Sequence, residues 1–65
     1  MVAEIVERFE TITGAGRMGP VVARLSDGRW QELSCGRVFP GFEALEQEMH
    51  KAWPRWRILH PQGGN

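Results

Sequence analysis

Apolar residues between positions 42 and 53 recur at the spacing of one face of a helix. The stripe sits at steps of i, i+3, i+7, i+10 and i+11, and its members are Phe42, Leu45, Met49, Ala52 and Trp53. Pro54 follows at once and disfavours the helical conformation for Trp53. The pattern therefore predicts one amphipathic helix that begins after Pro40-Gly41 and ends before Pro54.

A short strand is expected directly after the helix, over Arg55–His60. Strict alternation would place Trp56, Ile58 and His60 on one face and Arg55 and Arg57 on the other. The last five residues, 61–65, contain no large apolar side chain, so we expect them to form a frayed tail.

Two further strands are expected around a hairpin turn before the helix. Asp27-Gly28 is a strong turn signal because it is flanked by apolar residues, and it separates Val21–Leu25 from Arg29–Ser34. Cys35-Gly36 should end the second strand. The chain would then lead through Val38 and Phe39 into the helix without another strand.

The N-terminal segment Val2–Thr13 fits two structures. Five apolar residues, Val2, Ile5, Val6, Phe9 and Ile12, are spaced as on a helix, whereas the β-branched run at its end favours a strand. We favour a strand that ends near Thr13.

These elements predict a small α+β domain over residues 1–60 with the order β-β-β-α-β. An antiparallel meander would carry the helix on one face, and the C-terminal strand would return to the sheet. The predicted core comprises Phe9, Ile12, Val22, Leu25, Trp30, Leu33, Phe42, Leu45, Met49, Trp53 and Ile58. Replacing Leu45 or Trp53 by Ala should cost about 2–5 kcal/mol.

Length and composition narrow the classes of function. A chain of 65 residues lies near the lower limit for folding alone, so a partner or a second copy would help to stabilise it. Its formal net charge of zero argues against sequence-independent binding to nucleic acid. The single cysteine, Cys35, cannot form an internal disulfide, and no apolar run resembles a signal peptide or a membrane span. We therefore expect a cytoplasmic protein.

The segment Gly14–Gly19, which reads GAGRMG, matches the G-x-G-x-x-G pattern. It resembles the phosphate loop of nicotinamide-dependent dehydrogenases, and this resemblance implies that the glycines would cradle a pyrophosphate. In that family a helix begins inside the motif, whereas here Pro20 and two valines follow. A glycine-rich connection between strands is the interpretation we favour, with nucleotide binding as a remote alternative.

Residues for catalysis or metal binding are sparse. Cys35, His50 and His60 lie far apart and lack the paired spacing of a zinc site. Glu43 and Glu46 are three residues apart on the predicted helix, where they suit a solvated first turn. We expect neither an enzyme, nor a cofactor, nor a metal site.

The segment from Trp53 to Arg57, which reads WPRWR, is the most suggestive for binding. Tryptophan and arginine are enriched at interface hot spots and stack on nucleobases. If the strands neighbour one another suitably, Arg55 and Arg57 would lie beside Arg29 or Arg37 and form a basic sheet face. The residues that we expect to bind a protein partner or nucleic acid are therefore Arg29, Arg37, Arg55, Trp56 and Arg57. A purely structural interpretation competes, in which Trp56 is part of the core and the arginines are solvated.

Two functions follow as hypotheses. The first is a small non-catalytic binding module that docks on a protein partner or on a second copy, as suits an accessory protein of a bacterium or a mobile element. The alternative is nucleic-acid binding through the Arg/Trp face. No feature of the sequence points to a membrane partner.

Overall fold

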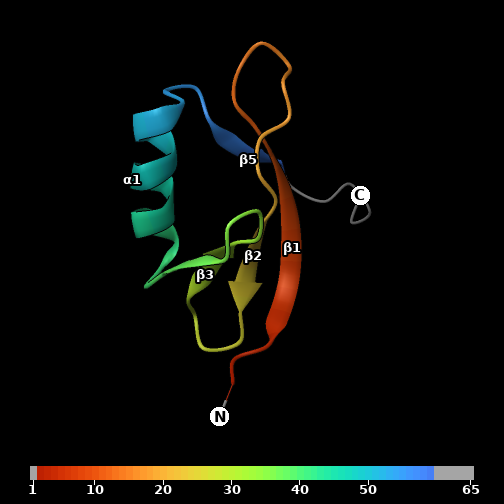
Figure 1. Cartoon of the computed structure of the whole chain (residues 1–65), viewed down its shortest axis with the longest axis vertical. Coiled ribbons are helices and arrows are strands. Elements are labelled where there is room, and N and C mark those ends of the chain that lie inside the picture. The colour runs from red at the N-terminus through yellow and green to blue at the C-terminus, as the bar shows by residue number, and fades with distance from the viewer. Residues whose placement is uncertain (1, 60–65) are drawn as a thin grey trace.

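In residues 2–59, which the computed structural model describes, five strands form one antiparallel sheet and one helix packs on it (Figure 1). The elements in chain order are β1 (Ile5–Ile12), β2 (Val22–Leu25), β3 (Trp30–Glu32), β4 (Arg37–Phe39), α1 (Phe42–Ala52) and β5 (Arg57–Leu59). The strands lie side by side in the order β4-β3-β2-β1-β5. This arrangement confirms the predicted α+β class, a meander with one helix and a C-terminal strand.

The first strand, β1, resolves the ambiguity at the N-terminus. It pairs with β2 on one side and with β5 on the other, so both edges of its backbone are hydrogen-bonded within the sheet. Phe9 and Thr11 alternate with exposed Glu10 and point into the core, as expected for a strand with one buried face. The register shifts between Ile5 and Glu7, where Val6 is the extra residue of a bulge.

The predicted hairpin at Asp27-Gly28 is confirmed between β2 and β3. The Leu25 carbonyl accepts the Gly28 N–H at 3.0 Å, and the Leu25 N–H donates to the Arg29 carbonyl at 2.8 Å. Gly28 has a φ of 92°, in the left-handed region that closes three-residue hairpin loops. The turn therefore follows from the residues at its own tip.

The expectation that the chain runs from β3 into the helix without another strand was wrong, because Arg37–Phe39 forms β4. The Gly36 N–H donates to the Glu32 carbonyl at 2.7 Å, and the φ of 81° at Gly36 allows the chain to reverse there. Phe39 then lies opposite Trp30 and is buried. A strand of three residues is too short to produce a clear alternation in the sequence.

The helix α1 has the predicted limits. Gly41 precedes it without a capping side chain, and the backbone N–H of Trp53 closes its end by donating to the Met49 carbonyl at 2.8 Å. Leu45 and Met49 are its buried residues. Among the described residues, no helix is long and apolar enough to cross a membrane.

The core lies between α1 and one face of the sheet. Its buried cluster consists of Phe9, Val22, Phe39, Leu45, Met49 and Trp56. Aromatic rings connect the sheet to the helix, with centroid distances of 5.4 Å for Phe9–Trp30, 5.0 Å for Trp30–Phe42 and 6.4 Å for Phe42–Trp56. Leu25 is buried as predicted, whereas Ile12, Leu33 and Ile58 are only half-buried.

Trp53, which the helical stripe assigns to the core, is exposed, and Trp56, whose position the sequence left open, is buried. Trp53 takes an extended conformation, with φ −137° and ψ 100°, so its side chain leaves the stripe and is 36% exposed. A turn follows, in which the Trp56 N–H donates to the Trp53 carbonyl at 2.9 Å, and it returns Trp56 to the core at 2% exposure. Arg55 lies in this turn and not on β5, which corrects the predicted start of the strand. The predicted strand end at His60 and the tail at 61–65 lie outside the described residues.

Candidate functional site

The glycine-rich segment lies in the connection between β1 and β2, where residues 13–18 form a second hairpin. We call this segment the glycine hairpin. Ala15 and Gly16 are its central residues, and both have positive φ, 52° and 76°. The Arg17 N–H donates to the Gly14 carbonyl at 3.0 Å, and the Thr13 N–H donates to the Arg17 carbonyl at 2.9 Å. The two positive φ values and the bond between Arg17 and Gly14 are typical of a type I′ turn, which suits the twist of paired strands.

This geometry differs from that of a phosphate loop. The segment leads into β2, whereas the glycines of a phosphate loop lead into the N-terminus of a helix. The amides of Thr13, Arg17 and Gly19 are already engaged in hydrogen bonds of the hairpin region. The resemblance to the dehydrogenase motif therefore extends to the letters of the sequence and not to the local fold.

Gly19 has a packing role of its own. A β-carbon at this position would lie 2.5 Å from Oγ1 of Thr11 and 3.0 Å from Cγ2 of Thr13. Thr11 is fully buried, and its Oγ1 donates a hydrogen bond to the Pro20 carbonyl at 2.7 Å. The third glycine of the motif is thus explained by the close approach of the backbone to Thr11.

An open depression of about 620 Å³ lies between the glycine hairpin and the turn at residues 53–55 that follows α1. The residues that line it are Thr13, Gly14, Ala15, Arg17, Met18, Trp53, Pro54 and Arg55. Its two walls touch, since a β-carbon on Gly14 would be 3.1 Å from Cβ of Arg55. Figure 1 shows both segments at the end of the sheet opposite the β2–β3 hairpin.

Exposed apolar groups and two arginines dominate this depression. Met18 is 60% exposed and Trp53 is 36% exposed, and both are large side chains that could gain from being covered. Among the described residues, the ion pairs involve Arg24, Arg29, Arg37 and Lys51, and neither Arg17 nor Arg55 takes part in one. Within residues 2–59, no carboxylate belongs to the lining. The depression therefore combines positive charge with apolar surface.

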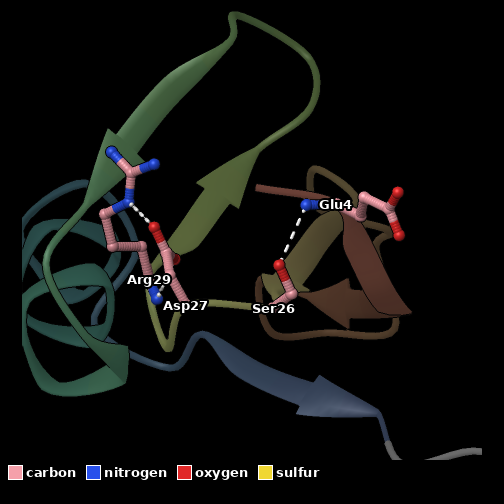
Figure 2. A network of polar contacts seen from close by, with 4 residues as sticks. All are labelled: Glu4, Ser26, Asp27 and Arg29. Atoms are coloured by element: carbon pink, nitrogen blue, oxygen red, sulfur yellow. Dashed lines mark hydrogen bonds and ion pairs between the residues drawn. The ribbon is translucent and has the colours of Figure 1, made fainter. Parts of the chain in front are cut away.

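Arg29, one of the predicted site residues, lies far from the depression at the tip of the β2–β3 hairpin. Its side chain is engaged there, with Nε 2.6 Å from Oδ2 of Asp27 and its backbone N–H 3.0 Å from Oδ1 (Figure 2). The backbone hydrogen bond is the largest cause that lowers the pKa of Asp27, and the arginine side chain adds to it. At the same hairpin, Ser26 Oγ accepts the Glu4 N–H at 3.0 Å (Figure 2). Arg29 thus stabilises a turn.

Arg37 and Arg57 lie on opposite edges of the sheet, because β4 and β5 are its two outer strands. Arg37 is engaged with α1, 3.6 Å from Glu48, and its guanidinium lies 4.9 Å above the Phe39 ring. The hydrogen bond from Lys51, followed by the charges of Lys51 and Arg37, lowers the pKa of Glu48. The basic sheet face that required these arginines to be neighbours does not form.

Of the five predicted site residues, only Arg55 lines the depression. Trp56 is buried beneath the helix, where the His50 ring meets it edge-on and His50 Nε2 lies 2.8 Å from the Trp56 carbonyl oxygen. Sequence reasoning missed Arg17, Met18 and the exposed position of Trp53. All three belong to the two segments that it examined separately, and their contact depends on the tertiary fold.

The lining of the depression offers guanidinium groups, an indole ring and a thioether. Cys35 is exposed on the β3–β4 turn and is not among the residues that line the depression. In residues 2–59, no three His, Cys, Asp or Glu side chains gather as a set that could hold a metal ion. No protein-family model, no curated protein and no solved structure matches the chain.

Proposed function

We propose that this chain is a non-catalytic binding module that docks on a protein partner through the depression between the glycine hairpin and residues 53–55. One observation carries the proposal: exposed Trp53 and Met18 stand beside Arg17 and Arg55 in one hollow. Tryptophan and arginine are the residues most enriched at interface hot spots, and methionine adapts its shape to varied partners.

The exposed part of Trp53 is large enough to matter. A fraction of 36% corresponds to roughly 90 Å² of a tryptophan surface, and covering it would contribute about 2 kcal/mol at ~25 cal/mol per Å². Met18, at 60% exposure, would add a comparable amount. These two side chains would form the apolar centre of the docking surface, with the arginines at its rim.

Nucleic-acid binding is the second candidate, and the geometry favours it less. A single strand needs a groove of continuous positive charge and aromatic platforms. Arg29, Arg37 and Arg57 are dispersed over one hairpin tip and two opposite sheet edges, and Trp56 is buried. The depression offers two arginines and one tryptophan, which suffices for a short ligand of limited length.

Selection of peptides tests the proposal without a known partner. A random peptide library displayed on phage is enriched on the immobilised chain and then measured against W53S, with R57Q as the matched control because Arg57 does not line the depression. We expect the enriched peptides to bind the parent chain and R57Q equally and W53S at least tenfold more weakly. Peptides that bind W53S as well as the parent, or a failure to enrich any peptide, would refute docking at this site.

A titration with a mixed-sequence single-stranded oligonucleotide separates the second candidate. Amide resonances of residues 13–18 and 53–55 are followed at low salt and again as the salt is raised. Shifts that the oligonucleotide causes and that salt abolishes would favour nucleic acid over protein.

A further inference from the structure

We infer that the segment that occupies the depression is acidic, with carboxylates that meet Arg17 and Arg55 and an apolar side chain that meets Trp53 and Met18. This inference rests on the proposed function and adds the chemistry of the partner. It follows from charge complementarity, from the contact of the Arg55 stem with the glycine hairpin and from the division of the lining into charged and apolar parts.

The two arginines of the depression favour a partner of negative charge. The two arginines of the depression face no carboxylate in the lining, and neither takes part in any of the ion pairs formed among the described residues. Asp27, Glu7 and Glu48 are engaged with other cations elsewhere in the fold. A carboxylate that enters the depression therefore meets a lining that carries two arginines, and it displaces no ion pair formed among the described residues.

The contact of Arg55 with the glycine hairpin also favours binding through its guanidinium group. Its stem packs on the glycine hairpin, with Cβ and Cδ 3.1 and 3.5 Å from the place where a β-carbon of Gly14 would be. The close contact depends on glycine because a β-carbon at position 14 would crowd Arg55, and the φ of 110° at this position also favours glycine. A side chain whose stem is already held loses less conformational entropy when its head group binds a partner.

The groups of the lining match carboxylates and an apolar side chain of a peptide. A guanidinium donates two parallel hydrogen bonds to one carboxylate, which gives both strength and direction. The apolar remainder of the lining, Met18, Trp53 and Pro54, suits an aliphatic or aromatic side chain between two acidic ones. A phosphodiester strand would instead require further cations along its path, and the three remaining predicted arginines lie elsewhere.

The test uses a fluorescein-labelled octapeptide that alternates glutamate with leucine, and a control with glutamine in place of every glutamate. Binding is measured by fluorescence anisotropy at low salt. We expect the acidic peptide to bind at least tenfold more tightly than the control and to shift the amides of residues 13–18 and 53–55. R17Q and R55Q should each weaken this binding at least fivefold, and R57Q should leave it within twofold.

A charge exchange provides a second readout that loss of folding cannot imitate. R55E should bind a lysine–leucine octapeptide that the parent chain does not bind. Equal binding of the acidic and glutamine peptides, or no effect of R17Q and R55Q, would overturn the inference.

The experiments separate two questions, whether a peptide docks in the depression and whether that peptide must be acidic. If phage-selected peptides depend on Trp53 but carry no acidic residues and bind R55Q normally, the docking site stands and the acidic partner is refuted. If the oligonucleotide competes with the acidic peptide and binds more tightly, the ligand is a nucleic acid. Amide shifts at residues 13–18 that appear on concentrating the chain alone would assign the depression to a second copy.

Discussion

Gly19→Ala tests whether the glycine-rich segment is a packed hairpin. The added β-carbon would lie 2.5 Å from Oγ1 of Thr11, a distance that real side chains do not tolerate. Thr11 must turn away, although it is fully buried and its hydroxyl donates to the Pro20 carbonyl at 2.7 Å. The substitution therefore both overpacks the core and breaks a buried hydrogen bond.

The two effects set the magnitude. Overpacking costs roughly 1–3 kcal/mol, and a buried hydrogen bond that loses one partner costs roughly 1–3 kcal/mol more. We expect G19A to lower the free energy of unfolding by about 2–6 kcal/mol, the sum of the two costs. For 65 residues the total is roughly 3–10 kcal/mol, so the variant should lie close to the limit of folding.

A double-mutant cycle isolates the contact with Thr11. T11A alone should cost about 1–3 kcal/mol because the Pro20 carbonyl loses its donor. In the T11A background the close contact is gone, and G19A should then cost no more than about 1 kcal/mol, from the remaining approach to Thr13. Urea unfolding followed by tryptophan fluorescence gives all four free energies.

Gly16→Ala, in the adjoining glycine hairpin, is the matched control. Gly16 has a positive φ of 76° but no neighbour within 4 Å of its added β-carbon, so its cost of about 1–2 kcal/mol should be the same with Thr11 or Ala at position 11. If G19A costs the same in both backgrounds, the packing explanation for this glycine is refuted.

Three further predictions concern the core and the hairpin tip. L45A should lower the free energy of unfolding by about 2–5 kcal/mol because Leu45 is fully buried. W53A should lower it by less than about 2 kcal/mol because Trp53 is partly exposed. Equal losses for the two variants in urea unfolding would contradict the assignment of Trp53 to the surface. W56A should lower the free energy of unfolding by about 3–5 kcal/mol, and W56F should lower it by less. The indole Nε1 of Trp56 is buried without a hydrogen-bond partner, so W56F removes an unsatisfied donor together with part of the ring. A larger loss for W56F than for W56A in the same assay would refute this explanation. The Asp27 carboxyl should titrate below the ordinary aspartate range in an NMR pH titration, and the stabilisation that it provides should be complete above the unfolded pKa and be lost as the pH falls through the folded pKa. In R29Q most of this lowering should persist, since the backbone N–H of residue 29 is its largest cause, and a return of the Asp27 pKa to its ordinary value would assign the effect to the side chain instead.

Local patterns account for the parts of the fold that were predicted correctly. The helix limits follow from a 3.6-residue apolar period and from Pro54, which acts on its immediate neighbour. The β2–β3 hairpin follows from Asp27-Gly28, since a turn needs only the residues at its tip. By contrast, β4 escaped prediction because three residues with two exposed side chains carry too little alternation.

The candidate site was only partly accessible to such reasoning. Both of its segments stood out by composition, one for its glycines and one for its tryptophans and arginines. The error lay in combining Arg55 and Arg57 with Arg29 and Arg37, because the neighbours of β5 could not be known. Trp56 was left open between core and surface, and the turn after α1 decides for the core.

The amino-acid sequence by itself determined the α+β class, the helix and the central hairpin, because each depends on residues a few positions apart. Only the tertiary structure decided the strand order, the burial of Trp56 in place of Trp53, and the meeting of the glycine hairpin with the turn at residues 53–55. These features depend on pairings such as Ile12 with Arg57, which lie at opposite ends of the chain. Such pairings are selected by the packing of the whole core, and no local pattern specifies them.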